Sequence, residues 1–455
     1  MKKVFLSIVI ALFSISLFAQ TPKYVFYVIG DGMGLSQAYL AQQYNKATNG
    51  GDINFMNFPV RTFVSTFCAN SLVTDSAASG TALATGSKTD SGQLGTLPDG
   101  SPVTSLAEMA KKKGLGAGVV TSVGINHATP AAFYAKVKSR NDYDIINQQL
   151  IDHNIDFAAG ATFLATKGST VKPEDWVAKA KAAGIEVFVG KDQYKTVKGK
   201  RVIYLSENLD RSQIHYEVDI QPSETSLQDF TKGAIDYLST NFKKGFFLMI
   251  EGGLVDGTGH STDAAACVNE VTGLSKALDI VLDFYAKHPN ETLIVVTADH
   301  ETGGLTMGAG AYSLSPKVLE NSKLSKEELS AKLIEMRKSE NEVTWSELKD
   351  FLRKNYGFWD TIELTADDEN RLAQAYKDFF LTRTSSQEKN LYSTNEQLAV
   401  AIIKVLEKHA EVTWAFSSHS GIPVPVYVKG VKASSFMGVQ DNTDLPKKIK
   451  EIARY

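Results

Sequence analysis

Short apolar runs recur along the chain, and each is long enough to form one buried strand. The clearest runs are 24–29, 118–122, 246–250, 293–297 and 424–428. Continuous apolar runs of this length are typical of strands buried on both faces, as in a parallel sheet covered by helices. The last run contains Pro425, which has no N–H for a ladder, so we expect it to form an edge strand.

Helical patterns lie between these runs. Ser105 followed by Glu108 is a capping-box start for a helix over 106–113, which Gly114 ends. Residues 229–241 and 263–288 also have helical spacing. This alternation of strand and helix predicts an α/β fold with a doubly wound, mostly parallel central sheet flanked by helices.

The pattern changes from about residue 315 to residue 395, where apolar runs give way to charged helical segments at 325–339 and 345–356. Ser325 with Glu328 is a second capping-box start. We interpret this stretch as a helical insertion in a single domain over 20–455, because strand patterns return after it. A separate C-terminal domain is the alternative.

The first residues have the pattern of a signal peptide. Lys2 and Lys3 precede an apolar run that ends at the small residue Ala19. We therefore expect residues 1–19 to be cleaved and the mature protein to be exported to the periplasm or the medium; a retained anchor is the alternative. No later apolar stretch reaches the roughly 20 residues that span a bilayer.

Composition and charge narrow the class of protein only slightly. The chain has 455 residues, 43% of them hydrophobic and 22% charged, which is ordinary globular usage. A net charge of −3 provides no basic field to gather nucleic acid. The only cysteines, Cys68 and Cys267, could pair in an exported protein or could be two buried thiols, and the sequence leaves this open.

Charged side chains directly follow three of the predicted strands. Asp31 comes after the first run, Glu251 after the run at 246–250, and Asp299 and His300 after the run at 293–297. Ligands bind at the carboxyl ends of strands in open α/β sheets. One such residue would mean little, but three strands that deliver carboxylates and an imidazole to one edge predict a functional site.

Two further segments carry candidate chemistry. Asp256 and His260 are four residues apart, so a helical turn would place them on one face, as in a zinc site with N and O ligands. A solvated turn is the alternative. Ser76 lies in a small-residue segment at a predicted helix N-terminus, where it could cap the helix or face an anion. No Gly-x-Ser-x-Gly elbow surrounds it, so a nucleophilic serine here would need a metal to lower its pKa.

Together these segments resemble alkaline phosphatase. The resemblance rests on Gly-Asp-Gly-Met-Gly at 30–34, Thr-Asp-Ser-Ala-Ala-Ser-Gly at 74–80, Asn-His-Ala-Thr-Pro-Ala-Ala at 126–132 followed by Ser139 and Arg140, and Thr-Ala-Asp-His-Glu-Thr-Gly-Gly at 297–304. In this order the motifs are highly specific, and they span about residues 23 to 430 apart from the insertion. The resemblance implies hydrolysis of phosphate monoesters through a phosphoserine.

The resemblance also implies a site with two zinc ions and one magnesium ion. By motif position, Asp256, His260 and His419 would hold the first zinc ion, and Asp31, Asp299 and His300 the second. Asp31 would also reach the magnesium ion, together with Thr129 and Glu251. Ser76 would be the nucleophile, Arg140 would clamp the phosphate and Asp75 would orient it. The other histidines, His153, His215, His288 and His409, match no motif and are expected to be ordinary.

The chain departs from enterobacterial members of the family at two positions. His127 stands where they carry an aspartate near the magnesium ion, as in vertebrate members, which implies looser magnesium affinity or zinc in the third site. Gly257 stands where they carry a lysine that reaches the phosphate through water. We therefore predict a higher Km and faster phosphate release than in lysine-bearing members.

Other functions share part of this pattern. A phosphodiesterase or phosphonate hydrolase of the same superfamily would keep the zinc ligands but generally lacks the third metal site and the Arg140 clamp. A non-catalytic phosphate- or metal-binding protein would not need Ser76. A sulfatase is disfavoured because no C/S-x-P-x-R segment is found. The expected partners are small phosphate monoesters, without nucleic acid specificity or a membrane, and a homodimer stays open because family members are often dimers.

Overall fold

A nine-stranded sheet organises the molecule. The computed structural model describes residues 21–153, 155–308, 310, 312–338 and 342–455, so the predicted signal peptide lies outside the described residues. Among these residues the sheet has the order β2-β15-β8-β1-β7-β3-β4-β6-β5. Its strands are β1 (Tyr24–Gly30), β2 (Val60–Val64), β3 (Gly116–Thr121), β4 (Phe157–Gly160), β5 (Glu186–Val189), β6 (Val202–Leu205), β7 (Phe246–Gly252), β8 (Thr292–Ala298) and β15 (Val424–Gly430). The predicted α/β fold is confirmed, and all five predicted strands form.

The central strands are parallel and in register. β1 pairs with β7 on one side and with β8 on the other, and Gly30 lies opposite Gly252 and Ala298. The pairs β3–β7, β3–β4, β4–β6 and β5–β6 are also parallel, whereas β15 is antiparallel to both of its neighbours. The carboxyl ends of β1, β7 and β8 therefore reach the same edge of the sheet at the same level.

The predicted edge position of the last strand is wrong, because β15 lies between β2 and β8. Pro425 pairs with Phe63 of β2, while the ladder to β8 begins two residues later, at Tyr427. The strand therefore accommodates the proline near its start, where the ladder to β8 needs no N–H from it. Thr297 Oγ1 donates a hydrogen bond to the Pro425 carbonyl at 3.1 Å.

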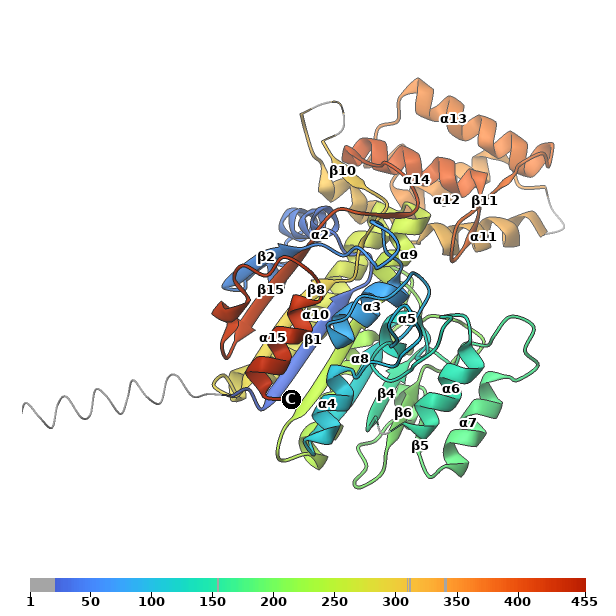
Figure 1. The fold of residues 1–455 in the computed structure, drawn as a ribbon. Coiled ribbons are helices and arrows are strands. Elements are labelled where there is room, and N and C mark those ends of the chain that lie inside the picture. The colour runs from blue at the N-terminus through green and yellow to red at the C-terminus, as the bar shows by residue number, and fades with distance from the viewer. Residues whose placement is uncertain (1–20, 154, 309, 311, 339–341) are drawn as a thin grey trace, which may run out of the picture.

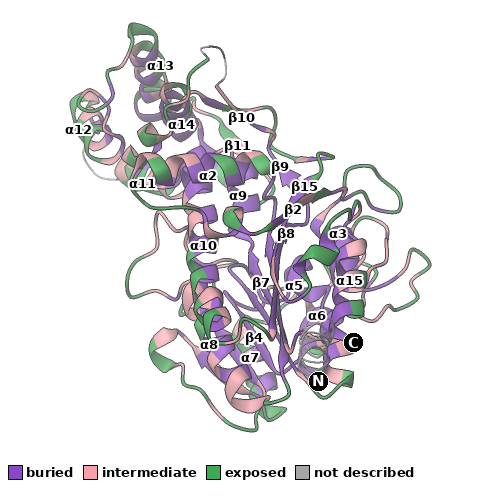
Figure 2. Cartoon of the chain, turned by 90° about the vertical axis from the view of Figure 1, so that its left-hand side faces the viewer, coloured by how far each residue is buried: buried purple, intermediate pink, exposed green. Residues whose placement is uncertain are grey.

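Helices cover both faces of the sheet. Figure 2 shows α2, α8 and α10 on one side and α3, α5 and α15 on the other. The helices of this layer structure are α2 (Leu35–Ala47), α3 (Ser76–Thr85), α4 (Leu106–Lys112), α5 (Ala128–Ala131), α6 (Tyr143–Asp152), α7 (Pro173–Ala182), α8 (Leu227–Asn241), α9 (Leu254–Ser261), α10 (Ala264–Lys287) and α15 (Asp444–Ala453). The predicted capping box forms, because Ser105 and Glu108 each accept the other's backbone N–H.

A group of helices, here called the helical module (residues 316–410), lies beyond the carboxyl ends of the central strands (Figure 1). It comprises η3 (Pro316–Asn321), α11 (Lys326–Lys338), α12 (Trp345–Tyr356), α13 (Ala366–Tyr376), η4 (Lys377–Leu381), the hairpin β11 (Gln387–Lys389) with β12 (Thr394–Glu396), and α14 (Gln397–Ala410). The sequence predicted α11 and α12 but not the hairpin.

The second predicted capping box is only half formed. Ser325 Oγ accepts the Glu328 N–H at 3.1 Å, as expected. The Ser325 N–H donates instead to Asp219 Oδ1 at 2.9 Å. The carboxylate therefore comes from the main domain, 106 residues earlier in the chain, and ties the start of α11 to it.

Short two-residue to three-residue strands complete the connections near the sheet edge. These are β9 (Glu301–Thr302), β10 (Leu305–Met307), β13 (Val412–Trp414) and β14 (His419–Ser420). β9 pairs with β14, which brings His419 opposite Thr302.

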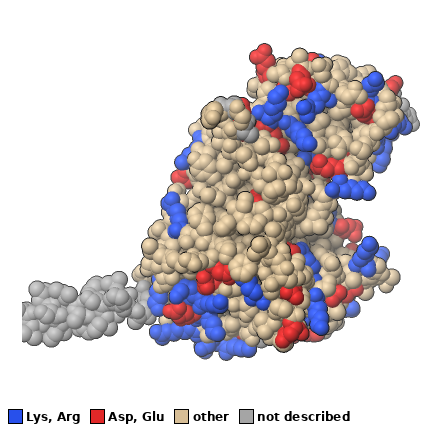
Figure 3. Space-filling model, turned by 45° about the horizontal axis from the view of Figure 1, so that its top comes forward, with Lys and Arg blue, Asp and Glu red and all other residues tan. Residues whose placement is uncertain are grey.

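The surface and the thiols fit the composition. Basic and acidic side chains are interspersed on the face that Figure 3 shows. In the part of the chain that the structure describes, no helix is long and apolar enough to cross a membrane. Cys68 and Cys267 are both buried and free, so they are two separate thiols.

Candidate active site

Three parallel strands deliver charged side chains to one edge of the sheet. Asp31 follows β1, Glu251 is the next-to-last residue of β7, and Asp299 and His300 follow β8. Because the strands are in register, these side chains meet. His300 Nε2 lies 3.4 Å from Asp31 Oδ1 and 3.3 Å from Asp299 Oδ2, and all three side chains are fully buried.

Helix α9 brings Asp256 and His260 to the same place. The predicted helical turn forms, and His260 Nε2 lies 3.3 Å from Asp256 Oδ2 and 3.1 Å from His419 Nε2. The turn after β1 approaches α9 closely at Gly32, which has a φ of 70°. A Cβ at Gly32 would lie 2.8 Å from the Cα atom of Asp256, so only glycine permits this approach.

Ser76 is the first residue of α3, but it does not cap the helix. Asp75 is the cap and accepts the Ala78 N–H at 3.1 Å. The Ser76 hydroxyl therefore stays available, and it lies 3.2 Å from His300 Nε2. A fully buried hydroxyl at a helix N-terminus, beside the carboxylate cluster, is placed to react with an anionic group.

Arg140 adds the one guanidinium of this cluster. Its Nη1 lies 3.2 Å from Asp75 Oδ2, and its Nη2 lies 3.1 Å from His127 Nε2. Burial opposes ionisation of Asp75, but the charge of Arg140 and the hydrogen bonds from Arg140 and the Ala78 and Gly92 N–H groups together outweigh it and lower the pKa of the carboxyl. Asp75 therefore holds the guanidinium as a charged partner and leaves donors free for an oxyanion.

The buried carboxylates share one feature: each has one oxygen in a hydrogen bond and one without a partner. The paired oxygens accept from Thr129 (to Asp31), Thr121 (to Glu251), Thr302 (to Asp256), and the Gly32 and His300 N–H groups (to Asp299). The oxygens without a hydrogen bond are Asp31 Oδ1, Glu251 Oε1, Asp256 Oδ2 and Asp299 Oδ2. Buried carboxylate oxygens are costly unless a cation or donor meets them, so the arrangement fits metal ions.

His260 and His419 are both oriented by a backbone carbonyl at Nδ1. His260 Nδ1 lies 2.8 Å from the Ser417 carbonyl, and His419 Nδ1 lies 2.9 Å from the Thr74 carbonyl. A carbonyl only accepts, so each Nδ1 carries the proton and each Nε2 offers a lone pair to the cluster. This is how metal-binding imidazoles are held in their ligating tautomer.

Burial dominates the electrostatics of the cluster. Burial and the charge of Asp299 raise the pKa of Asp31 well above its ordinary range. Burial is the largest effect that raises the pKa of Glu251, to about 7, and that of Asp299, to about 8. The charge of Asp256 also raises both values. The protein alone thus disfavours the charged forms of these three carboxylates, and bound cations would stabilise them. Burial has the same effect on Asp256, but the neighbouring histidines, His260 first, outweigh it and lower the pKa of that carboxyl.

Three groups of side chains could each hold a metal ion, with ligand atoms within 4.8 Å of one another. They are Asp31 with Asp299 and His300, Asp31 with His127 and Glu251, and Asp256 with His300 and His419. Thr129 Oγ1 lies 3.5 Å from Asp31 Oδ2, beside the second group. The structure thus brings the predicted ligand side chains together and groups His127 with Asp31 and Glu251. The group around Asp256 and His419 contains His300 where the sequence predicted His260, which lies beside both residues.

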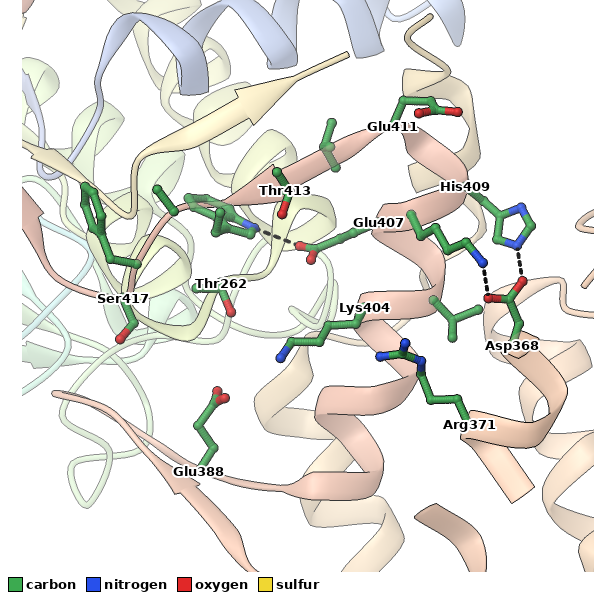
Figure 4. A pocket seen from close by; sticks show the side chains of 16 residues that line it. Thr262, Asp368, Arg371, Glu388, Lys404, Glu407, His409, Glu411, Thr413 and Ser417 are labelled. Atoms are coloured by element: carbon green, nitrogen blue, oxygen red, sulfur yellow. Dashed lines mark hydrogen bonds and ion pairs between the residues drawn. The ribbon is translucent and has the colours of Figure 1, made fainter. Parts of the chain in front are cut away.

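The four histidines expected to be ordinary lie outside these groups. His153, His215, His288 and His409 instead face single carboxylates at 2.9 to 3.9 Å. A cavity of about 860 Å³ also lies away from the cluster, lined by Asp368, Arg371, Glu388 and residues of α14 and β13 (Figure 4). None of the predicted site residues lines it.

Sequence reasoning missed two side chains at the site. Thr302 Oγ1 lies 2.5 Å from Asp256 Oδ1 and 3.2 Å from His300 Nδ1, and it belongs to the Thr-Ala-Asp-His-Glu-Thr-Gly-Gly stretch. Tyr392, from the hairpin of the helical module, packs its ring against His260 at 5.3 Å between ring centres. No signal in the polar sequence around Tyr392 connects it with the strand ends.

The comparisons with known proteins agree with this geometry. The sequence profile of the family described as alkaline phosphatase matches residues 22–455. The chain belongs to the alkaline phosphatase family. It is 31% identical over 442 residues to alkaline phosphatase 4 of Bacillus subtilis (strain 168), covering 92% of this chain and 86% of that relative. It is 28% identical over 462 residues to the repressible alkaline phosphatase of Saccharomyces cerevisiae, covering 92% and 78%.

Solved structures of alkaline phosphatases have the same fold. The cold-active alkaline phosphatase from a psychrophilic Shewanella sp. matches with a TM-score of 0.79 and 28% identity, covering 94% of this chain and 99% of that one. The Thermus thermophilus alkaline phosphatase matches with a TM-score of 0.77 and 23% identity, covering 96% and 93%. The family inferred from the motifs is confirmed, and the protein is a phosphomonoesterase of the alkaline phosphatase family with candidate metal sites.

Proposed function

We propose that this alkaline phosphatase forms a phosphoserine on Ser76 in a site that holds two zinc ions and one magnesium ion. The observation that carries the proposal is the set of four buried carboxylates, each with one oxygen lacking a hydrogen bond. They face the Nε2 atoms of the site histidines and the Ser76 hydroxyl.

The three proposed sets of ligands differ in their share of nitrogen and oxygen donors. Asp256, His260 and His419 would hold the first zinc ion, and Asp31, Asp299 and His300 the second, because zinc accepts mixed N and O ligands. Asp31, Thr129 and Glu251 would hold the magnesium ion through hard oxygen atoms. His127 lies in the same group, so zinc could take this third position instead.

The chain's own residues would carry the reaction in two steps. Arg140 binds two phosphate oxygens, and Asp75 holds Arg140 in place. Ser76 Oγ attacks phosphorus, the bond to the ester oxygen breaks, and the alcohol leaves with a proton. Water then attacks the phosphoserine, the bond to Oγ breaks, and phosphate leaves while Ser76 regains its proton. The bound ions would supply positive charge to the attacking and leaving oxygens.

Monoesters are favoured over diesters by two observations. The Arg140 guanidinium, close to Asp75 and His127, is placed to bind non-bridging phosphate oxygens. A monoester has one more of these oxygens than a diester. The third group, around Glu251, adds a further cation position. A phosphodiesterase or phosphonate hydrolase of the superfamily is the second candidate function.

The test compares p-nitrophenyl phosphate with bis-p-nitrophenyl phosphate at alkaline pH. We expect the monoester to be the better substrate, EDTA to abolish turnover, and added zinc and magnesium to restore it. Ser76→Ala should lower kcat by about 10³-fold or more, because the nucleophile is lost. Ser101→Ala, at an exposed serine, is the control and should behave as the wild type.

Two results would contradict parts of the proposal. Faster turnover of the diester would assign the protein to the second candidate function. Full activity in Ser76→Ala would exclude the phosphoserine.

Export and assembly are further parts of the proposal. We infer that residues 1–19 are removed, so that the exported protein starts at Gln20. N-terminal sequencing of protein recovered from the periplasm or medium tests this, and a chain that retains Met1 would contradict it. Light scattering of the purified protein tests whether it forms a homodimer, which the resemblance leaves open.

A further inference from the structure

The hairpin of the helical module reaches over the metal cluster. β11 and β12 are joined by four residues, and Tyr392 lies at this tip. Its ring meets His260 edge-on, with 5.3 Å between ring centres, and it meets His127 at 6.2 Å. The tyrosine ring therefore contacts two of the histidines of the site.

The tip is held in a defined conformation. Asn390 Oδ1 accepts the Tyr392 N–H at 3.2 Å and the Ser393 N–H at 2.7 Å. The base of the hairpin is fixed to α11, because the Glu396 N–H donates to Ser330 Oγ at 3.1 Å. The position of Tyr392 is therefore set by the helical module, and the ring needs no rearrangement to face the site.

The phenol end of Tyr392 points inward. The residue as a whole is 38% exposed, but its hydroxyl lies close enough to Asp256 for a hydrogen bond and within range of the charge of Arg140. The ring also lines a cavity of about 210 Å³ together with His127 and Gly257. The hydroxyl is thus near Arg140, the group that the proposed function assigns to the phosphate oxygens.

Gly257 leaves this side of the phosphate position without a side chain of its own. Glycine adds no side-chain hydrogen-bond donor to this cavity. A tyrosine hydroxyl can donate one hydrogen bond to a phosphate oxygen, which is a charge-assisted contact.

We propose that Tyr392 is a substrate-binding residue, whose hydroxyl donates a hydrogen bond to a non-bridging oxygen of the bound phosphoryl group. This inference rests on the proposed function of the site. It makes the helical module part of the active site, since the module supplies a side chain that touches the substrate.

The experiment measures the binding of inorganic phosphate to the metal-loaded protein by calorimetry, together with kcat and KM for p-nitrophenyl phosphate. Tyr392→Phe keeps the ring and removes only the hydroxyl. We expect the Kd of phosphate and the KM to rise about tenfold, as for the loss of one hydrogen bond to a charged group, while kcat is maintained or rises. Leu391→Ala, at the neighbouring 62% exposed residue, should match the wild type.

Three outcomes would overturn the inference. An unchanged phosphate Kd in Tyr392→Phe would show that the hydroxyl does not touch phosphate, even if Tyr392→Ala weakens binding through loss of the ring. A fall in zinc content of Tyr392→Phe would show that the residue acts on His260. An equal effect of Leu391→Ala would assign the change to the hairpin. If the wild type binds phosphate but hydrolyses no monoester, the proposed function fails, while the calorimetric comparison still tests Tyr392.

Discussion

At the scale of single residues, Gly257 leaves room for the Tyr216 hydroxyl beside the proposed phosphate position. A Cβ at Gly257 would lie 2.8 Å from the hydroxyl oxygen of Tyr216, and Tyr216 is only 4% exposed. The hydroxyl therefore occupies space that the first atom of any side chain would need. A lysine at position 257 would therefore require Tyr216 to move.

We expect Gly257→Lys alone to lower the free energy of unfolding by about 1–3 kcal/mol, because it overpacks the site against Tyr216. Combined with Tyr216→Phe, which removes the crowding oxygen, the lysine should fit and lower the Km below that of Tyr216→Phe alone. Calorimetric melting and steady-state kinetics measure both effects. A single variant as stable as the wild type would contradict the packing, and an unchanged Km in the double variant would contradict the predicted effect of the lysine.

At the scale of elements, the helical module holds the end of α9, the helix that carries Asp256 and His260, two of the three predicted ligands of the first zinc ion. Lys326, at the start of α11, is 1% exposed, and its Nζ donates to the carbonyls of Ser261 and Thr262 at the end of α9. Its backbone N–H donates to Asp263 Oδ2 at 2.7 Å. A cation at a helix C-terminus meets the free carbonyls and the negative end of the dipole, so Lys326 fixes α9.

A second contact fixes the beginning of the next helix. Glu407 of α14 accepts the Ala264 N–H at 2.9 Å and the Trp414 indole N–H at 2.8 Å, beside the cavity shown in Figure 4. The turn between α9 and α10 is thus held by two side chains of the module. The module therefore supports the metal site from outside as well as reaching over it.

Lys326→Met should therefore weaken both folding and metal binding. The free energy of unfolding should fall by about 1–3 kcal/mol, because buried carbonyls lose their donor and Asp263 loses its cation. The zinc affinity of the site should fall with it, which zinc titration and calorimetric melting would measure. Lys332→Met, at an exposed lysine on the same helix, is the control. Wild-type zinc affinity in Lys326→Met would show that α9 is positioned without the tether.

These contacts also show how far the sequence could predict the site. The strand-end residues such as Asp299 were foreseeable, because parallel strands end at one edge and the ligands follow buried runs directly. Lys326 was not, because a lysine at the start of a charged helix has the pattern of a solvated residue. Its burial depends on carbonyls 64 and 65 positions away. Tyr392 was hidden for the same reason, since only the folded module carries its hairpin to His260.

At the scale of the whole molecule, the buried carboxylates of the site destabilise the metal-free protein. The nearly neutral net charge of −3 conceals a concentration of buried carboxylates at the sheet edge. The family typically binds metals, and the proposed cations would offset this charge where the helices and the strands meet. Metal removal should therefore change the stability of the fold, and not only its activity.

The pH dependence of stability in the metal-free protein is the sharpest test of this view. The folded-state pKa of Glu251 is raised to about 7 and that of Asp299 to about 8, from ordinary values of 4.5 and 3.8. Between about pH 4 and pH 8 the folded protein therefore binds more protons than the unfolded chain, so its free energy of unfolding falls as pH rises. We expect the melting temperature of EDTA-treated protein to drop steadily from pH 5 to pH 9. The corresponding loss in the free energy of unfolding should be on the order of a few kcal/mol.

Protein reloaded with zinc and magnesium should show a much smaller drop, because bound cations keep these carboxylates ionised at every pH in this range. Glu251→Gln should make the curve of the metal-free protein shallower, since one of the buried carboxyls with a raised pKa is gone. Parallel curves for metal-free and metal-loaded protein would mean that the buried carboxylates do not face the ions.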